Sequence, residues 1–159
     1  QRNVIILRSF SKSYGLAGLR IGYAIASGEC IALMNRVRQP FNVNAMALVA
    51  ALAALDDESH LCKTRKLIQK ELSFLMEQFS RLGLSYVPSV TNFILVDVED
   101  GRTVFKALQK EGVIVRPMDA YGLPRHVRIT VGTRNENKRC ISALSRMLGK
   151  PPSDYFNKA

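Results

Sequence analysis

The feature that most constrains the fold is a long apolar stripe in the middle of the sequence. Its residues recur at spacings of four, three, four and three, at Ile68, Leu72, Leu75, Phe79 and Leu82. This is the repeat of one face of an α-helix. Asp56 or Asp57 is expected to cap its start, and Gly83 is typical of a residue that ends a helix. A helix of this length with one polar side suits a connector between two lobes.

Two short apolar runs flank a polar loop near the start of the chain. The runs, Asn3–Leu7 and Ile21–Ala26, are partly β-branched and bounded by turn-forming residues, so both are predicted to be buried strands. Helical composition follows over Glu29–Arg38. Asn44 is expected to cap the apolar segment Ala45–Leu55, which is predicted to be a fully buried helix.

Beyond Gly83 the pattern changes to strands that alternate with helices. The predicted strands and helices, in chain order, are Asn92–Val96, Thr103–Gln109 (helix), Val113–Val115, Val127–Val131 and Asn135–Leu148 (helix). This alternation over residues 91–148 indicates a compact α/β lobe. The tail from Lys150, which contains two prolines, is expected to be poorly ordered.

Cysteine and hydropathy patterns point to a cytoplasmic protein. No apolar run approaches the ~18 residues that span a bilayer, and the start of the chain does not resemble a signal peptide. The three cysteines are odd in number and lack CxxC spacing, which argues for reduced thiols rather than a disulfide framework or a zinc site. His60 and His126 are single, so they are expected at the surface, and no metal site is predicted.

The net charge of +10 allows two interpretations. One is an anionic partner, such as a nucleic acid or a membrane surface. The other is a solvated basic face, which the dispersion of the cations over helical segments favours, because no RNA-binding or zinc-finger pattern accompanies them. The dispersed cations are Arg36, Arg38, Lys63, Arg65, Lys66, Lys70 and Arg81. We therefore predict neither a nucleic-acid nor a membrane partner.

The polar loop "RSFSKSYGLAGLR", Arg8 to Arg20, carries groups that could bind a phosphate and a lysine whose amine could react. Lys12 is flanked by apolar strands, so partial desolvation would favour the neutral amine that Schiff-base formation needs. The hydroxyls of Ser9 and Ser11 and the guanidinium of Arg20 could together hold a dianionic phosphate.

A second interpretation of the same loop is a serine nucleophile. Ser9 to Lys12 also matches S-x-x-K, the signature of β-lactamases and penicillin-binding proteins. That chemistry needs a serine at the start of a helix, with S-D-N and K-T-G elements elsewhere. Neither element is present, and Lys12 lies between strands.

The stretch "SFSKSYGLAGLRIGY" resembles the lysine motif of fold-type I aminotransferases, in which the lysine binds pyridoxal 5′-phosphate (PLP) covalently. The stretches "RQPFNVN", "TNFILVDV", "GVIVRPM" and "VRITVGT" follow in order and resemble the histidinol-phosphate aminotransferase branch. The resemblance covers residues 1 to about 148 and corresponds to the C-terminal half of such an enzyme.

The resemblance implies an α/β fold, the C-terminal portion of the aspartate aminotransferase-like fold type I of PLP-dependent transferases. Residues 1–56 would form the end of the large PLP-binding domain and its sheet. Residues 57–82 would form the connecting helix, residues 83–149 the small α/β domain, and residues 150–159 a tail.

The resemblance also implies roles for matching positions. Lys12 would be the catalytic Schiff-base lysine and proton shuttle, and Ser9, Ser11 and Arg20 would bind the cofactor phosphate with it. Arg128 would hold the substrate carboxylate, and Arg116 would be a second substrate arginine. Two arginines could serve a phosphate and a carboxylate in turn.

The implied activity is transamination between L-histidinol phosphate and 2-oxoglutarate, with glutamate as the other amino acid, in histidine biosynthesis. The full-length enzyme would be a cytoplasmic homodimer, and the piece present here would be inactive alone. Aromatic amino acid aminotransferases and threonine-phosphate decarboxylases share the fold and remain alternatives. A non-catalytic basic binding module is a remote alternative, which a salt-sensitive affinity for nucleic acid would support.

Overall fold

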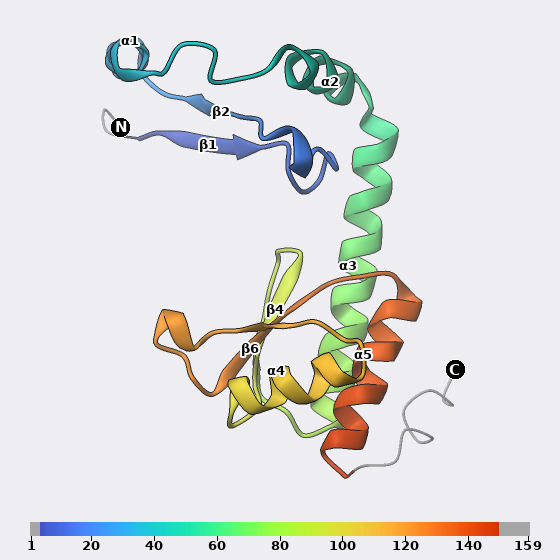
Figure 1. Ribbon diagram of the computed structural model, residues 1–159. Coiled ribbons are helices and arrows are strands. Elements are labelled where there is room, and N and C mark those ends of the chain that lie inside the picture. The colour runs from blue at the N-terminus through green and yellow to red at the C-terminus, as the bar shows by residue number, and fades with distance from the viewer. Residues whose placement is uncertain (1–3, 150–159) are drawn as a thin grey trace. The chain divides into compact units, whose positions relative to one another are not determined.

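The computed structural model describes residues 4–149 and divides into two compact units between Arg65 and Lys66. We call the part before this division unit 1 and the part after it unit 2. The division falls inside helix α3 (Glu58–Arg81), drawn in green in Figure 1. The tail from Lys150, for which poor order was predicted, lies outside the described residues.

Unit 1 contains a two-stranded antiparallel sheet of β1 (Ile6–Ser9) and β2 (Gly22–Ile25). The loop between these strands includes a short 3-10 helix, η1 (Ala17–Leu19). Two helices follow, α1 (Gly28–Val37) and α2 (Ala45–Asp56). Each begins at a side-chain cap because a hydroxyl or amide oxygen accepts an otherwise unpaired backbone N–H. Ser27 Oγ accepts from Cys30 N, and Asn44 Oδ1 accepts from Ala47 N, as predicted for Asn44.

Two predictions about burial in unit 1 are wrong for the described residues. All four residues of β1 are exposed, and β2 is exposed except for half-buried Ala24. In α2 only Ala47 and Ala51 are buried, while Leu48 and Leu52 are more than half exposed. A strand or apolar helix is buried only where other elements cover it, and the described part of unit 1 forms only a small core around Phe10. The first strand also lies later than predicted, since its pairing with β2 runs from Ile6 to Ser9.

Helix α3 forms where the apolar stripe predicts it. At its start Asp57 Oδ1 accepts from His60 N, which confirms one of the two expected caps. At its end Gly83 has a φ of +69°, a conformation that glycine adopts without a Cβ clash. Leu84 N donates to Phe79 O and Gly83 N to Ser80 O, the paired bonds of a Schellman motif.

Unit 2 is a four-stranded antiparallel sheet with helices packed on one face (Figure 1). The strand order is β3 (Tyr86–Val87), β4 (Phe93–Asp97), β6 (His126–Thr130) and β5 (Arg116–Pro117). Helices α4 (Gly101–Lys110) and α5 (Arg134–Met147) join the stripe of α3 in one core. The predicted α/β lobe is therefore confirmed.

The side chains of β4 and β6 alternate between the two faces of this sheet, as strand geometry requires. Ile94, Val96, Val127 and Ile129 are buried on the helix-covered face. Their neighbours along the strands point to the other face and are half-buried or exposed. We call this second face, which carries Phe93, Leu95, Arg128 and Thr130, the open face.

One predicted strand is wrong, because Val113–Val115 is not paired. Val113 N instead donates to Leu108 O, and Gly112, at a φ of +71°, closes the end of α4. These residues are therefore used to end a helix, and pairing begins at Arg116, opposite Arg128. Strand β3 was not predicted, since two residues give no measurable alternation.

Candidate functional site

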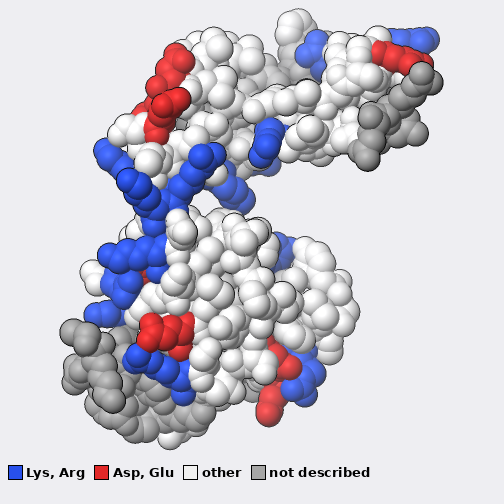
Figure 2. Space-filling view, turned by 180° about the vertical axis from the view of Figure 1, so that it is seen from behind, with Lys and Arg blue, Asp and Glu red and all other residues white. Residues whose placement is uncertain are grey.

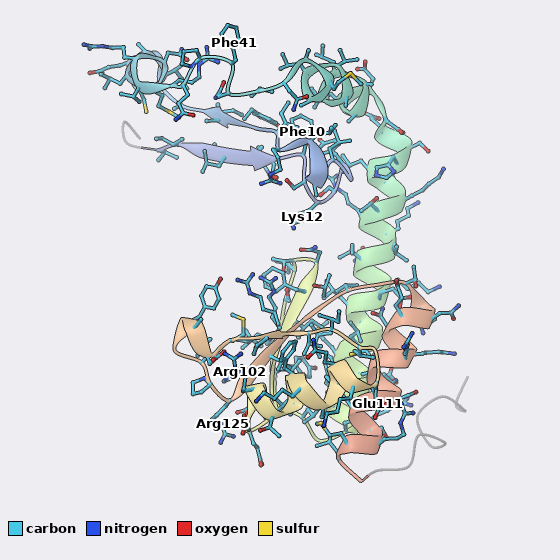
Figure 3. The ribbon with its side chains drawn as sticks, viewed as in Figure 1. Phe10, Lys12, Phe41, Arg102, Glu111 and Arg125 are labelled. Carbon is cyan, nitrogen blue, oxygen red and sulfur yellow. The ribbon has the colours of Figure 1, made fainter. Side chains whose placement is uncertain are left out.

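Lys12 lies in a tight loop directly after β1. Phe10 is buried, and its N–H donates to Ile21 O at 3.2 Å, which fixes the loop to the start of the return strand. Ser9 Oγ accepts from Ser11 N at 3.1 Å. Gly15, at a φ of +72°, donates its N–H to Lys12 O at 2.9 Å, so the chain turns back immediately after the lysine. Figure 3 shows Lys12 extending outward from this loop, away from Phe10.

The expected partial desolvation of Lys12 is not found in the described residues, where its side chain is exposed. The flanking strands do not enclose it, because their own side chains are exposed on both faces. The loop thus presents an accessible primary amine.

Arg20 returns toward the same loop, as predicted. Its Nη1 donates to Ala17 O at 2.7 Å, and its backbone lies in the left-handed region at a φ of +57°. A non-glycine residue in this region costs free energy and is often found at functional sites. Arg20 also lines an open pocket of about 770 Å³ together with Arg8 and Arg38. Ser9, Ser11 and Lys12, the other residues predicted to bind a phosphate, do not line this pocket.

The serine-nucleophile alternative requires Ser9 at the start of a helix. In the structure Ser9 is the last residue of β1, and its hydroxyl is used to accept from Ser11 N. The geometry of Ser9 therefore does not match that alternative.

In unit 2, Arg116 and Arg128 are directly opposite each other on β5 and β6. Opposite residues of an antiparallel pair share one face of the sheet, with Cβ atoms ~5 Å apart. Two like charges in this position destabilise a sheet unless an anion or another group compensates them. The sequence analysis predicted Arg128 within a strand and Arg116 directly after another, and the structure shows that the two share the open face.

An aromatic ring lies beside each of these arginines. The guanidinium carbon of Arg128 is 4.8 Å from the ring centre of Phe93, and that of Arg116 is 5.2 Å from the ring centre of Tyr121. Arg116 Nη2 also donates to Tyr121 Oη at 2.7 Å. The Nε of Arg128 is buried and has no hydrogen-bond partner among the described residues. Since buried donors are nearly always paired, this N–H fits a site that is completed by a ligand.

Sequence reasoning missed Phe93 and Tyr121. Tyr121 belongs to the 3-10 helix η2 (Asp119–Tyr121), between β5 and β6. For Tyr121 the only signal in the sequence was its position next to Gly122 and five residues after Arg116. This signal is weak when the fold is not known.

The remaining candidate residues support no second site. His60 is exposed, as expected, whereas His126 is half-buried on β6, so its predicted surface position is only partly right. Within residues 4–149, no group of three or more His, Cys, Asp or Glu side chains could hold a metal ion, and no helix is long and apolar enough to cross a membrane. The seven cations assigned to a solvated face are all exposed. Figure 2 shows Lys and Arg gathered along α3 among neutral residues.

All three cysteines are free thiols, as expected. Cys62 is exposed and Cys30 is half-buried, whereas Cys140 is buried. Burial raises the pKa of the Cys140 thiol to about 12.

Comparisons with known proteins show what the sequence and the fold are similar to. Histidinol-phosphate aminotransferase 1 of Nitrosococcus oceani is 55% identical over 92% of this chain and 40% of its own length. A Sinorhizobium meliloti histidinol-phosphate aminotransferase, solved in complex with pyridoxal-5'-phosphate, superposes with a TM-score of 0.82 at 29% identity, over 93% of this chain and 42% of that one. L-threonine-O-3-phosphate decarboxylase from Porphyromonas gingivalis superposes with a TM-score of 0.81 at 28% identity, over 94% of this chain and 48% of that one.

The architecture is that of the fold-type I aminotransferases, an α/β fold, of which this chain contains less than half. The family model for aminotransferase class I and II matches residues 1–144. The chain therefore belongs to the class I and II aminotransferase family. It spans about 40% of the length of the curated relatives that it matches.

Proposed function

We propose that the full-length protein is a PLP-dependent histidinol-phosphate aminotransferase, which exchanges an amino group between L-histidinol phosphate and 2-oxoglutarate in histidine biosynthesis. The observation that carries this proposal is the pair Arg116 and Arg128 on one face of the sheet. Paired guanidinium groups suit a substrate that is phosphorylated in one half-reaction and a dicarboxylate in the other. The identity of about 50% to several histidinol-phosphate aminotransferases supports the same assignment.

The residues of the lysine loop fit PLP. This cofactor combines a phosphate with an aldehyde, and the loop offers hydroxyls at Ser9 and Ser11, a cation at Arg20 and an exposed amine at Lys12. When bound, PLP supplies an electron sink that stabilises charge on the substrate α-carbon. Ser9, Ser11 and Arg20 would hold the phosphate of the cofactor.

Lys12 has two tasks in this proposal. Its amine would hold the cofactor aldehyde, and the same amine would move a proton to and from the substrate α-carbon. Arg116 and Arg128 orient the substrate through its anionic group. The stereochemistry of the proton transfer then depends on which side of the substrate the Lys12 amine reaches.

A threonine-phosphate decarboxylase is the second candidate, because the pair of arginines would suit that phosphorylated substrate as well. The two functions differ in their products. Release of carbon dioxide from threonine phosphate, without amino transfer to 2-oxoglutarate, would favour the second candidate.

The assembly and location of the full-length protein are also proposals. We infer a homodimer in the cytoplasm, with a large domain that includes residues 1–56, a connector at 57–82 and a small domain at 83–149. Size-exclusion chromatography with light scattering of the full-length protein measures the oligomeric state.

Reduction with borohydride tests the central proposal. In the full-length protein loaded with PLP, borohydride should fix the cofactor to one lysine, and peptide mapping should find the label on Lys12. Lys12→Ala should remove both the label and amino transfer while retaining the fold. Lys63→Ala is a matched control, since Lys63 is an exposed helix residue. A label on any other lysine would exclude this assignment of Lys12.

A further inference from the structure

The hydroxyl of Tyr121 can still donate a hydrogen bond, because it only accepts in its bond with Arg116. In the bond of 2.7 Å between them the guanidinium donates and Tyr121 Oη accepts. A phenolic hydroxyl both accepts and donates, whereas arginine can only donate. The O–H of Tyr121 therefore remains available for an acceptor that lies close to the guanidinium of Arg116.

The turn that carries Tyr121 is held firmly against β6. Met118 N donates to His126 O at 3.1 Å, and Tyr121 N donates to Met118 O at 3.0 Å. Asp119 forms an ion pair with Arg102 of α4. Tyr121 is 58% exposed, so these contacts fix the residue without enclosing it. Tyr121 is thus oriented beside Arg116 and accessible to a ligand.

The number of donors at this place favours a particular anion. The guanidinium groups of Arg116 and Arg128 occupy one face of the sheet, and the tyrosine hydroxyl adds a neutral donor at the Arg116 side. A carboxylate offers two oxygens, whereas a phosphate monoester offers three terminal oxygens and up to two negative charges. A third donor group beside two guanidinium groups therefore suits the phosphate, which has one more terminal oxygen and more charge than the carboxylate.

We infer that Tyr121 determines specificity for the phosphorylated substrate by donating a hydrogen bond from Oη to the phosphate held by Arg116 and Arg128. This inference rests on the proposed function and names a further residue of the same site. It assigns Tyr121 a second effect, since its ring and its oxygen also orient the guanidinium of Arg116.

The test compares Tyr121→Phe with the unchanged full-length protein in both half-reactions. Phenylalanine keeps the ring beside Arg116 and removes only the hydroxyl. We expect KM for L-histidinol phosphate to rise roughly ten- to a hundredfold, as for loss of one hydrogen bond to a charged group, and KM for glutamate to change less than twofold. The affinity for inorganic phosphate, measured by calorimetry, should fall by a similar factor, which gives a readout that is independent of turnover.

Tyr86→Phe is the matched control. Tyr86 also carries a hydroxyl on this sheet, but it lies on β3 at the opposite edge from β5, where its oxygen is 3.3 Å from Ser80 Oγ. Its KM values should stay unchanged. Tyr121→Leu is a second variant that removes the ring as well, and it should weaken the phosphorylated substrate more than Tyr121→Phe does.

The outcomes separate this inference from the proposed function. If Tyr121→Phe changes neither KM, or changes both equally, Tyr121 has no role in specificity. If that result occurs while Arg116→Ala still weakens L-histidinol phosphate, the phosphate site stands and only the role of Tyr121 is lost. If Arg116→Ala is also without effect, the proposed function fails as well.

Discussion

Arg116 and Arg128 are cross-strand neighbours on the same face of the sheet, twelve residues apart in the sequence and joined by the turn that carries Tyr121. Each guanidinium lies against an aromatic ring, Tyr121 for Arg116 and Phe93 for Arg128. A cation–π contact positions a guanidinium beside an aromatic ring. Both guanidinium groups therefore have aromatic partners within unit 2, and Arg116 also donates a hydrogen bond to Tyr121.

The substitutions of Arg116 and Arg128 should have different effects on substrate binding. In the full-length protein, Arg116→Ala should weaken L-histidinol phosphate more than glutamate. Arg128→Ala should weaken the binding of both, because we propose that Arg128 holds the carboxylate of glutamate and contacts the phosphate of L-histidinol phosphate. Loss of one charged contact corresponds to ~1.5–3 kcal/mol, or roughly ten- to a hundredfold in affinity. Steady-state kinetics of both half-reactions measure this.

The control for the arginine variants is Arg125→Ala, since Arg125 is bound to Asp97 and is exposed. Its kinetic constants should match those of the unchanged protein. If Arg116→Ala leaves the kinetic constants for the phosphorylated substrate unchanged, the proposed function would be reduced to an aminotransferase of unspecified substrate.

Glu71 should be important for stability. It is 2% exposed on α3, and its carboxylate accepts from Arg134 Nε at 3.0 Å and from Asn137 Nδ2 at 2.9 Å. Glu71→Ala leaves these donors without their acceptor, and we expect a loss of about 2–3 kcal/mol in the free energy of unfolding. Urea denaturation followed by circular dichroism measures this difference.

Glu77→Ala is the comparison for Glu71, since Glu77 lies on the same helix and is paired with Arg81 at the surface. Exposed pairs contribute less than about 1 kcal/mol, so its effect should be small. Equal effects of the two substitutions would show that the buried contacts of Glu71 add nothing.

Glu136 should contribute a pH-dependent part of the stability. Hydrogen bonds from the backbone N–H and the hydroxyl of Thr133, in the capping box of α5, lower the pKa of Glu136 below its ordinary value of 4.5. A lowered folded-state pKa gives stability that is present above the ordinary value and is lost as the pH falls through the lowered one. Glu136→Gln does not titrate, so its free energy of unfolding should fall less steeply with acidification in this range.

This pH dependence can be checked at the carboxyl group itself. Thr133→Ala removes the hydroxyl, so the pKa of Glu136 measured by NMR should rise toward its ordinary value. An unchanged pKa in this variant would mean that the hydroxyl of Thr133 does not stabilise the carboxylate.

The cysteines should differ in reactivity. Only the thiolate is nucleophilic, and burial raises the pKa of Cys140 to about 12. In the native protein near neutral pH, iodoacetamide should modify exposed Cys62 first and leave Cys140 unmodified. After denaturation all three should react. Mass spectrometry of tryptic peptides identifies each site, and native labelling of Cys140 would show that its helix opens readily.

Local features of this fold could be predicted from the sequence because they depend on a few neighbouring residues. Asn44 and Asp57 cap helices through their own side chains. Gly83 ends α3 because the backbone there needs a positive φ. The loop around Lys12 was also recognisable, since its serines, lysine and arginine are close in sequence.

Burial was not predictable from the local pattern alone. Strands β1 and β2 and helix α2 are as apolar as core elements, yet they are largely exposed in the described residues. The pattern states which side chains favour burial, but contacts with other elements decide which of them are covered. The failed strand at Val113–Val115 has a similar cause, since the end of α4 uses the N–H of Val113.

By itself the sequence determined the α-helices, strands β1, β2, β4 and β6, and the residues for which chemistry is proposed, because propensity, capping and motif spacing are local properties. Only the tertiary structure decided that β5 pairs with β6 in the register that sets Arg116 opposite Arg128. It also decided that Tyr121 and Phe93 lie beside them. Register and ring placement follow from packing between segments far apart in the chain, and a one-residue slip would send Arg128 to the opposite face of the sheet.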